Sequence, residues 1–440
     1  MNTIQLKPRL IRPVQDPLGL FIRVARGDSQ CVQNFLEIKG AHFHGVVIDP
    51  TRTALDKELR DTAAKRSVDI VLDPKTQESA FDGSFTAKLG KLPWGAGRTH
   101  VISDFEGASG RRHASAIAEF VKKNGFTKVL SPSHLLIDHD DDWLAVDLDM
   151  AEHLREALDK SGATNVPIAY SLAMPYSILR NPDEFALIVE RIEKTVADEL
   201  WLKVENFGSD ASPTGVKNYI EAMRAIHGLD MPLIADHVGG LVGLSLVALG
   251  GVGGLSHGIT LRERFSAAYW RELSDEAPQF GLHHRVYLSD LDLHVKVADA
   301  KNLFDRTTAL RAKIGCRDTE CCPRGVHDTL EQPGQHFLSQ RVKQFARLGE
   351  VPKRLRPAVF VDEFVRPASD QAMTISNMRI ADEKFANRVK KQRLRLDALR
   401  KTLVTFVESR PADSFSALPK TRLVRESTRG SSNENWRPGL

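Results

Sequence analysis

Cysteine is scarce in this sequence, and apolar residues never form a long unbroken run. Only 4 of the 440 residues are cysteine, and three of these are close together at Cys316, Cys321 and Cys322. Such usage argues against a disulfide-stabilised secreted fold and indicates a reducing, cytoplasmic environment. No stretch approaches the roughly eighteen apolar residues that indicate a membrane-spanning helix. Residues 1–13 lack the apolar core of a signal peptide, so we expect a cytoplasmic protein without a membrane segment.

The chain also has little net charge. Its 61 Lys and Arg against 57 Asp and Glu give a formal net charge of +4 at pH 7, so the overall charge alone indicates no partner. Hydrophobic residues make up 42% and charged residues 27% of the chain, as in ordinary globular enzymes. A chain of 440 residues is long enough for one large domain with an appendage, or for two domains.

From about residue 20 to residue 300, short β-branched runs alternate with segments of helical periodicity. Nine runs are candidate strands: 44–48, 69–72, 99–102, 128–130, 167–169, 200–204, 232–235, 252–255 and 285–288. Amphipathic segments such as 111–123, 150–160 and 215–227 lie between them. This alternation predicts βαβ units and a parallel sheet. We therefore expect an α/β fold, a (β/α)8 barrel of the TIM type, with either one miscounted run or one extra strand among the nine.

Polar residues follow the ends of most candidate strands. They are Asp49, Asp73, Asp104, His134, Glu205, Asp236, His257 and Asp290. In a (β/α)8 barrel the chemistry lies at the carboxyl ends of the strands, so these are candidate site residues. For Asp49 and Asp73 the alternative is a turn, since Asp-Pro is also an ordinary helix-start signal. Asp104 is a stronger candidate because it lies with Glu106 in a loop of small residues.

Glycine is concentrated between Ala248 and Phe265. The glycines of its first part are Gly250, Gly251, Gly253 and Gly254, and Ser256, His257 and Gly258 follow them. Glycine lets the backbone approach a ligand closely, because it has no Cβ and adopts positive φ freely. We expect these backbone amides to bind a ligand at the mouth of the barrel. A phosphate group is one candidate, since phosphate sites near the last barrel strands are common.

The three clustered cysteines form a candidate metal site. Cys316, Cys321 and Cys322 supply three thiolates, and either His327 or His336 supplies a fourth ligand. Three thiolates and one imidazole satisfy tetrahedral zinc, and a site closed by four protein ligands is structural rather than catalytic. The C-x4-C-C spacing differs from the usual C-x2-C hairpin, so a buried group of free cysteines or a redox pair is the alternative.

After the expected zinc-binding segment (301–340), the sequence predicts helices without intervening strands. The region 341–408 includes a basic helix at 384–401, and the tail 409–440 has the Ser-, Arg-, Pro- and Asn-rich composition of a disordered segment. The apolar residues of the basic helix share one face; they are Phe385, Val389, Leu396 and Leu399. The basic face suits a nucleic-acid backbone, whereas the apolar stripe is explained equally well by packing on a partner helix.

Taken in order, these features resemble the tRNA-guanine transglycosylase family, which includes enzymes that place 7-deazaguanines in nucleic acid. The hallmark G-G-L-A-V-G-E loop of the family is similar to residues 253–259, and its T-D-S-G-G-F-Q loop is distantly similar to residues 103–107. The family has a nucleophilic aspartate before a three-Cys, one-His zinc site, where this chain has Asp290 and Asp292. The chain departs from the family in its cysteine spacing, in Ile259 where the loop has glutamate, and in lacking a Pro-Thr-Arg segment.

The resemblance implies base exchange on a purine-type base in tRNA or DNA. Asp290 or Asp292 would attack the anomeric carbon as the base leaves, and Asp104 would transfer protons. The backbone amides of Gly253, Gly254 and Leu255 would hydrogen-bond the base, with Glu205 on its N–H face. His257 and Asp236 would complete the substrate site. The basic C-terminal helices would hold the phosphates.

Three other functions fit parts of the sequence. A metal-dependent hydrolase would use His42 and His44, with ligands drawn from Lys203, His237, His257 and Asp290. Against it, both His42 and His44 precede the apolar residues of their strand, at the wrong end of a barrel. An enzyme acting on a phosphorylated sugar or nucleotide would use the glycines of 250–254 as a phosphate cradle. A non-catalytic scaffold would bind nucleic acid through its basic helices.

Overall fold

The computed structural model describes residues 8–9, 19–38, 40, 43–229, 231–260, 262–271, 285–306, 308–410 and 424–425. Most of the segment 409–440, for which the sequence predicts disorder, therefore lies outside the described residues. Within them, no helix is both long and apolar enough to span a membrane.

Eight parallel strands form a closed barrel, as the alternating sequence pattern predicts. The strands are β2 (Gly19–Arg23), β3 (Gly45–Ile48), β4 (Asp69–Leu72), β5 (Lys128–Leu130), β6 (Ile168–Pro175), β7 (Glu199–Glu205), β8 (Leu233–Asp236) and β9 (Gly254–His257). The first strand pairs with the last, which closes the barrel at Gly19 opposite Gly254. Near-continuous apolar runs such as Ile70–Leu72 suit these strands because both faces are covered, one by the interior and one by helices.

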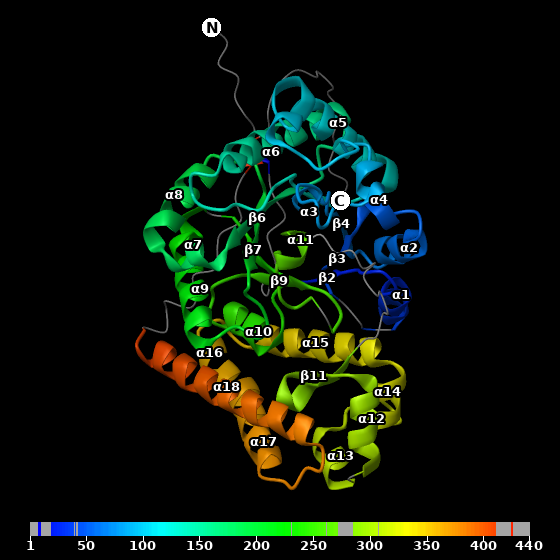
Figure 1. The fold of residues 1–440 in the computed structure, drawn as a ribbon, viewed down its shortest axis with the longest axis vertical. Helices are drawn as coiled ribbons and strands as arrows, with labels where there is room; N and C mark the ends of the chain where they lie inside the picture. The colour runs from blue at the N-terminus through cyan, green and yellow to red at the C-terminus, as the bar shows by residue number, and fades with distance from the viewer. Residues whose placement is uncertain are drawn as a thin grey trace, which may run out of the picture.

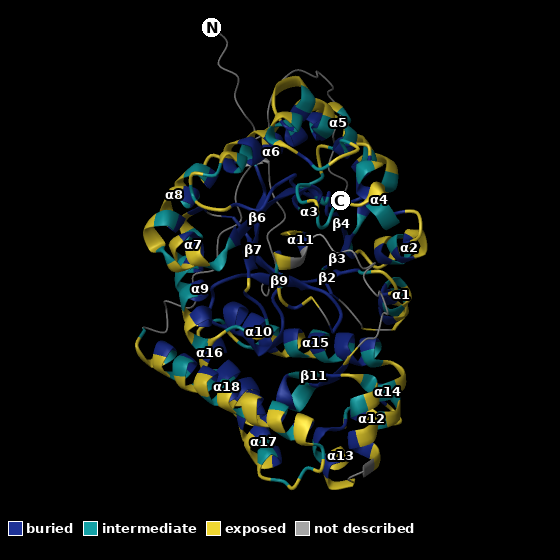
Figure 2. Ribbon diagram, in the orientation of Figure 1, coloured by how far each residue is buried: buried dark blue, intermediate teal, exposed yellow. Residues whose placement is uncertain are grey.

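Amphipathic helices surround the strands, with buried inner faces and exposed outer faces (Figures 1 and 2). They are α1 (Ser29–Glu37), α2 (Lys57–Lys65), α5 (Gly107–Asn124), α6 (Asp142–Lys160), α8 (Pro182–Ile192) and α9 (Pro213–Ala225). The helix α10 (Gly240–Ala248) also belongs to this ring, but all of its residues are buried. Short helices α3 (Thr76–Ser79), α4 (Ala87–Gly90), α7 (Tyr176–Arg180) and α11 (Ala268–Arg271) lie in the connecting loops.

The strand predictions differ from the structure at three places. Residues 99–102 form no strand; a 3-10 turn at Ile102–Asp104 lies there instead. The strand β10 (Val286–Leu288) pairs antiparallel with β11 (Leu293–Val295) outside the barrel. The first barrel strand, β2, is not among the nine predicted runs. A run of four or five residues is too short for its periodicity to distinguish a barrel strand from other extended segments.

The C-terminal region is helical, as predicted. It contains α12 (Val297–Arg306), α13 (Thr308–Ile314), α14 (Val326–Glu331), α15 (Pro333–Glu350), α16 (Arg356–Phe360), a π-helix (Val361–Val365), α17 (Arg366–Ser376) and α18 (Glu383–Glu408). Figure 1 shows α15 between α10 and α1, in the ring of helices around the barrel. The Gln335 side chain on α15 donates to the Cys31 carbonyl on α1 at 2.7 Å. The C-terminal region is thus joined to the barrel through α15.

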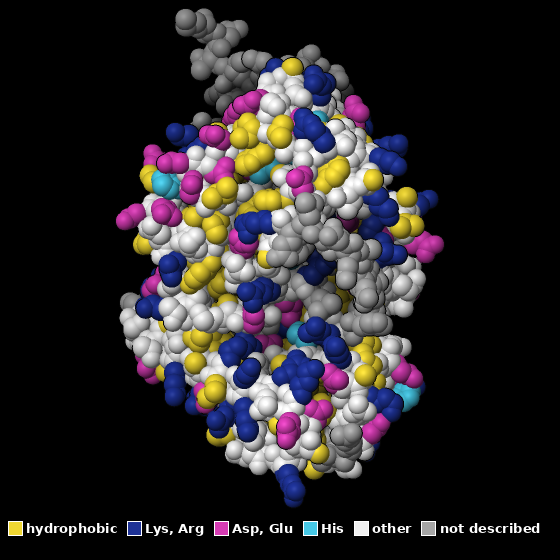
Figure 3. All heavy atoms as spheres, in the orientation of Figure 1, with side chains coloured by type: hydrophobic (Ala, Val, Ile, Leu, Met, Phe, Trp, Pro, Cys, Tyr) yellow, Lys and Arg dark blue, Asp and Glu magenta, His cyan; other side chains and the backbone are white. Residues whose placement is uncertain are grey.

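The apolar stripe of α18 is buried within the chain itself. Phe385, Val389, Leu396 and Leu399 are each no more than 4% exposed. Packing against other helices of the same chain therefore explains the stripe, and no partner helix is needed. Basic side chains of α18 such as Lys390, Lys391 and Lys401 are exposed on the outer side, where Figure 3 shows Lys and Arg gathered over this helix. Arg395 instead points inward and pairs with the buried Asp292.

Candidate active site at the barrel mouth

Inward-facing side chains fill the barrel interior in layers. At the amino ends of the strands, Lys128 pairs with Glu199 at 2.6 Å, and Trp201 donates to Glu199 at 3.0 Å. An apolar layer follows, made of Phe21, Val47, Val71, Leu130, Ala169, Trp201 and Ile234. These layers close the barrel from below. Only the carboxyl ends of the strands can therefore hold a site, as in other barrels of this type.

At the carboxyl ends, a buried arginine joins two carboxylates. Arg23 binds Asp236 through Nε–Oδ1 at 2.6 Å and Nη2–Oδ2 at 2.5 Å, and its Nη1 donates to Asp73 Oδ2 at 2.6 Å. All three residues are less than 9% exposed. Burial by itself would raise the pKa of Asp73 and Asp236, but the Arg23 guanidinium outweighs it and holds both pKa values well below the usual range. Both carboxylates are therefore ionised.

Lys203 lies beside this group on β7. Its Nζ donates to Gln77 Oε1 at 2.6 Å and lies 3.9 Å from Asp236 Oδ2. Gln77 is held in turn by donating to Ser133 Oγ at 2.9 Å and Ser171 Oγ at 3.2 Å. Burial and the neighbouring Arg23 lower the pKa of Lys203, although Asp236 and Asp73 oppose them. A desolvated lysine next to another cation is a known way to obtain a neutral, nucleophilic amine.

The segment after β9 covers this amine. The Phe265 ring centroid lies 5.5 Å from Lys203 Nζ, and Phe265 packs with Leu135, Ala173 and Trp270. Figure 1 shows α11 over the centre of the ring of strands. At its end, Arg271 binds both oxygens of Glu205, at 2.7 and 3.1 Å. We call residues 262–271 the roof; it is apolar above Lys203 and keeps the group out of water.

Left-handed backbone conformations are concentrated in the loops at this end of the barrel. The residues other than glycine with positive φ in these loops are Lys75, Asn206, His237, Thr260 and Arg262. They follow β4, β7, β8 and β9. Such conformations are sparsely populated and cluster at functional sites. One of them, His237, is held neutral because burial lowers its pKa well below the ordinary value.

The predicted catalytic aspartates lie in three separate ion pairs. Asp104 accepts two hydrogen bonds from Arg98, both 2.8 Å, and caps the Val101 amide. Asp290 pairs with Arg317 at 3.0 Å on the surface. Asp292 is buried and accepts from the Leu241 amide and from Arg395, both at 3.1 Å.

None of these three aspartates has a described hydrogen bond or ion pair with the Lys203 group. Of the predicted substrate residues, Asp236 and Glu205 do lie at the mouth, each bound to an arginine. The structure therefore does not bring Asp104 together with Asp290 or Asp292 as a catalytic pair.

The glycine-rich stretch lies at the opposite end of the barrel from its expected position. Gly254 begins β9, and the Gly253 amide already donates to the Leu233 carbonyl at 2.9 Å. A Cβ on Gly254 would lie 2.6 Å from Ile234 and 2.7 Å from the Gly19 carbonyl oxygen. These glycines allow close packing where the barrel closes. The placement of Gly253, Gly254 and Leu255 at the mouth, and of a phosphate cradle at 250–254, is corrected accordingly.

The histidines proposed for a hydrolase are dispersed. His44 precedes β3 and accepts from the Leu20 amide at 3.3 Å, so it lies at the amino ends of the strands, and His42 lies outside the described residues. His257 ends β9 but packs outward, with its ring 5.8 Å from Phe337 of α15. Among the described residues, two groups have metal-ligand geometry, and neither lies at the mouth.

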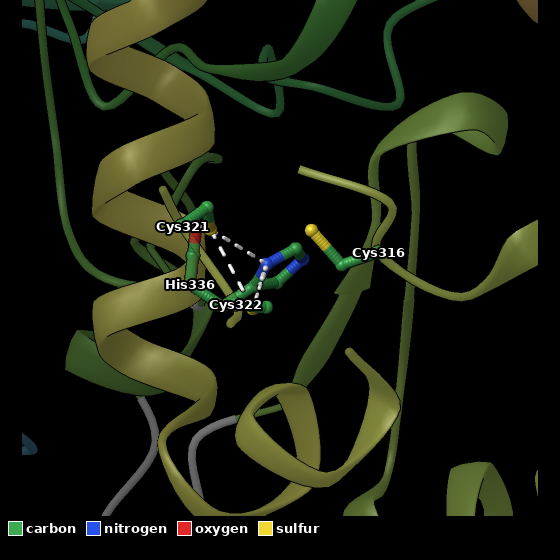
Figure 4. A group of neighbouring side chains, drawn as sticks. All are labelled: Cys316, Cys321, Cys322 and His336. Carbon is green, nitrogen blue, oxygen red and sulfur yellow. Dashed lines mark hydrogen bonds between the residues drawn. The ribbon is translucent and has the colours of Figure 1, made fainter. Parts of the chain in front are cut away.

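The first of these groups is the predicted cysteine cluster. The ligand atoms of Cys316, Cys321, Cys322 and His336 all lie within 4.8 Å of one another. His336 Nδ1 is 3.3 Å from Cys321 Sγ and 3.4 Å from Cys322 Sγ, and the two sulfurs are 3.6 Å apart. Figure 4 shows Cys316 facing them across the imidazole. Ligands bound at 2.0–2.3 Å in a tetrahedron are roughly 3.5–3.8 Å apart, so the group fits a metal ion.

The structure distinguishes the two candidate histidines. His336 Nε2 lies 2.9 Å from the Tyr287 carbonyl oxygen, and a hydrogen bond of this kind orients metal-binding imidazoles. His327 instead belongs to an exposed group with Asp328 and Glu331, whose carboxylates both bind Arg324. A pocket of about 340 Å³ borders the cysteine cluster and is lined by Pro323, Gln332 and Gln335, among others.

Sequence reasoning named Asp73 and Asp236 as strand-end residues, and Lys203 as part of an alternative site. It missed Arg23 and Gln77. Arg23 carries a usable signal, since it ends the apolar run Leu20–Ile22 as a single charged residue. Gln77 carries none, because a polar residue in a loop is ordinary.

No family model matches this sequence, and no curated protein matches it. Similar solved structures include thiamine phosphate pyrophosphorylase from Pyrococcus furiosus, with 15% identity over 59% of this chain and 94% of that chain (TM-score 0.30). A GH18 chitinase from Pseudoalteromonas aurantia has 14% identity over 57% and 97% (TM-score 0.35). Penicillium canescens endo-1,4-beta-xylanase XylE has 10% identity over 54% and 81% (TM-score 0.37). None of the three is a tRNA-guanine transglycosylase, and likenesses this weak indicate nothing about the chemistry of this chain.

Proposed function

We propose that this protein is a barrel enzyme in which Lys203 forms a Schiff base with a small carbonyl substrate. The observation that carries the proposal is the position of Lys203, a buried amine at the carboxyl end of a barrel strand, between Arg23 and an apolar roof. A lysine that served only as a counter-ion would be expected to contact a carboxylate closely. Lys203 instead contacts an amide oxygen at 2.6 Å, with the nearest carboxylate oxygen at 3.9 Å.

The surrounding residues suit the reaction. The neutral amine adds to the carbonyl carbon. The carbonyl oxygen then takes up one proton from the amine nitrogen and one from solvent and leaves as water, giving an iminium ion. Neutral His237, in the loop after β8, is the available group for moving protons. Asp236, fixed by Arg23, supplies negative charge beside the developing cation. The iminium then accepts the electron pair of a C–H bond on the adjacent carbon, and His237 takes the proton released.

The test is chemical trapping. The protein is incubated with aldehydes, 2-oxo acids and ketose phosphates in the presence of cyanoborohydride, and the adduct is located by peptide mass spectrometry. We expect a reduced adduct on Lys203 with the correct substrate class, and none in a Lys203→Met variant. Lys75→Arg is the matched control, because Lys75 also lies at the mouth, half-buried, but Glu78 and Asp73 outweigh burial and raise its pKa. Adducts spread over exposed lysines, with Lys203 unlabelled, would contradict the proposal.

We further propose that the Cys316, Cys321, Cys322 and His336 group holds a structural zinc ion. Three thiolates and one imidazole with these separations are the donor set that zinc prefers. All four positions around the metal are then protein ligands. The zinc would stabilise the connection between α14 and α15 and would take no part in the reaction.

Base exchange on nucleic acid is a second proposal, supported by two observations. A three-Cys, one-His group follows the barrel, as the resemblance to tRNA-guanine transglycosylases requires. The outer face of α18 also presents cations around a pocket of about 280 Å³ lined by Val361, Arg366, Arg400, Lys401, Val404 and Thr405. In this version the carboxylates at the mouth, Asp73 and Asp236, are better placed than Asp104 and Asp290. Both are already bound by Arg23, which makes them poor nucleophiles and favours the Schiff-base proposal.

A further inference from the structure

The helix α15 links the cysteine cluster to the roof above Lys203. It carries His336 and, five residues later, Arg341, which is 1% exposed. Arg341 Nη2 donates to Glu263 Oε1 at 2.9 Å, and its Nη1 donates to the Tyr287 hydroxyl at 3.0 Å. The Tyr287 carbonyl is the group that orients His336. One short stretch of helix therefore contacts the candidate metal centre and the barrel loop at the same time.

Glu263 holds two loops of the mouth together. It belongs to the roof, two residues before Phe265, which lies over Lys203. Its Oε1 also accepts from the Gly240 amide at 3.1 Å, at the start of α10 and four residues after Asp236. Its Oε2 lies 2.8 Å from His294 Nε2. The loop after β8, which carries His237, is thus fastened to the loop after β9, which carries Phe265.

The fit around Glu263 is tight. A Cβ on Gly239 would lie 2.0 Å from Glu263 Oε1, so the carboxylate can reach the Gly240 amide only because residue 239 has no side chain. Glu263 is 4% exposed and far from water. A buried carboxylate is stable only when paired, and Arg341 and His294 are its cationic or donor partners. Loss of Arg341 would therefore drive the Glu263 side chain out of this position and break the link between the roof and the loop after β8, leaving the roof held by the backbone hydrogen bonds of Glu263 and Phe265 to the loop after β7.

We propose that Arg341 is a positioning residue for the reaction at Lys203: through Glu263 it keeps the roof closed over the amine, and the Cys3His centre holds its helix in place. This role of Arg341 rests on the proposed function, the reaction at Lys203, but the experiment that tests it needs no substrate. Closing the roof removes water from Lys203, which is the condition for a neutral amine. Opening it restores hydration and lets a substrate enter, as with other mouth-closing loops.

The test measures the reactivity of Lys203 without a substrate. Formaldehyde and cyanoborohydride methylate every accessible neutral lysine, and peptide mass spectrometry gives the rate at Lys203 against pH. We expect slow labelling in the wild type and labelling at least about tenfold faster in Arg341→Met, because the closed state is weakened. The pH midpoint of the variant should also rise toward that of exposed lysines. Arg341→Lys should restore part of the wild-type behaviour.

Two controls separate positioning from general damage. Arg347→Met removes an exposed arginine on the same helix, which pairs with Glu363, and should leave Lys203 labelling unchanged. If Arg341→Met does not fold, Glu263→Gln replaces it, because this isosteric change keeps an acceptor for Gly240 while removing the ion pair. Metal content should stay the same in these variants. Removing the metal with a chelator should increase the methylation rate of Lys203 in the wild type. The same treatment should increase it little further in Arg341→Met.

Unchanged labelling of Lys203 in a folded Arg341→Met or Glu263→Gln variant would overturn the positioning proposal. The outcome is separate from that of the Schiff-base proposal. Absence of any carbonyl adduct in the wild type, together with faster methylation in Arg341→Met, would contradict the proposed function and leave the positioning role supported. A carbonyl adduct on Lys203 in the wild type, together with unchanged methylation in Arg341→Met, would support the proposed function and contradict the positioning role.

Discussion

Arg23 donates two parallel hydrogen bonds, of 2.6 and 2.5 Å, to the Asp236 carboxylate across the interior of the barrel. The two residues are 213 positions apart and belong to β2 and β8. A third charged group, Asp73 on the β4 side, completes the cluster. Because a guanidinium matches a carboxylate in this fork arrangement, the pair fixes both side chains and sets the electrostatics around Lys203.

Removing Arg23 should destabilise the fold strongly. In Arg23→Met, Asp73 and Asp236 are left as buried carboxylates without their main partner, which costs about 3–5 kcal/mol. The measurement is urea unfolding followed by circular dichroism at neutral pH. Arg98→Gln is the control, since its ion pair with Asp104 is on the surface and screened by water, and its midpoint should match the wild type. Equal midpoints for the two variants would show that the Arg23 cluster is not structurally important.

Stability should rise with pH between about 4 and 6.5, in part because of His100. Burial and the neighbouring His134 and His113 lower the pKa of His100 to about 4, against an unfolded value of about 6.5. In this window the unfolded chain binds the proton and the folded chain does not. The contribution is therefore complete above pH 6.5 and is lost as the pH falls toward 4, amounting to about 3 kcal/mol.

Replacing the ring tests this assignment. Both nitrogens of His100 lack a hydrogen-bond partner in the described structure, so His100→Leu costs no polar contact. The variant should show a shallower rise of unfolding free energy between pH 4 and 6.5, measured by urea titration at several pH values. His327→Gln is the control, because that ring is exposed and loses little hydration on folding. A slope in His100→Leu as steep as in the wild type would refute the prediction.

The metal prediction depends on which histidine is changed. His336→Ala should abolish bound zinc, because it removes one of the four ligands and the group oriented by Tyr287. His327→Ala should keep one zinc per chain. Inductively coupled plasma mass spectrometry of the purified variants gives the number of zinc ions per chain. The adjacent pocket gives a chelator access to the wild-type site, so slow removal of zinc by a chelator is also expected. Metal retained in His336→Ala, or absent from His327→Ala, would contradict the assignment.

The glycines of β9 should matter for stability rather than for binding. In Gly254→Ala the new methyl group would press on Ile234 and on the Gly19 carbonyl, and such overpacking costs about 1–3 kcal/mol. Gly228→Ala is the matched control, since a Cβ there meets nothing within 4 Å. The midpoints of thermal unfolding of the two variants are compared with that of the wild type. A Gly254→Ala protein as stable as Gly228→Ala, yet unable to bind a ligand that the wild type binds, would restore the ligand-binding interpretation of this stretch.

Nucleic-acid binding, if it accompanies base exchange, should depend on the outer face of α18. Replacing Arg400 and Lys401 by glutamine should weaken binding of a tRNA or a DNA duplex and reduce the salt slope by about 1 for each phosphate that is no longer neutralised. Fluorescence anisotropy at several salt concentrations gives both quantities. Lys88→Gln with Lys91→Gln, on the distant α4 side, is the control pair. Affinity that is insensitive to salt would exclude this surface as a nucleic-acid site.

Local sequence patterns predicted the barrel well, because each strand shows its own apolar run. Ile70–Leu72 and Leu200–Val204 are examples, and each ends in a polar residue at the mouth. The same patterns wrongly predicted a strand at residues 99–102 and missed the strand Gly19–Arg23, because the periodicity of so few residues is a weak signal. The candidate site was predicted only in part: Asp236 and Glu205 lie at the mouth, whereas Asp104, Asp290 and Asp292 do not share a site.

By itself, then, the sequence determined which side chains share a face of a strand, where the thiolates are concentrated and that α18 is basic. The tertiary structure alone decided that Arg23 meets Asp236, that His336 rather than His327 joins the cysteines, and that the glycines of β9 lie at the closed end. The reason is physical. Alternation along a strand is a local property, but distances between strands follow from the closure of the barrel and the register of each pair.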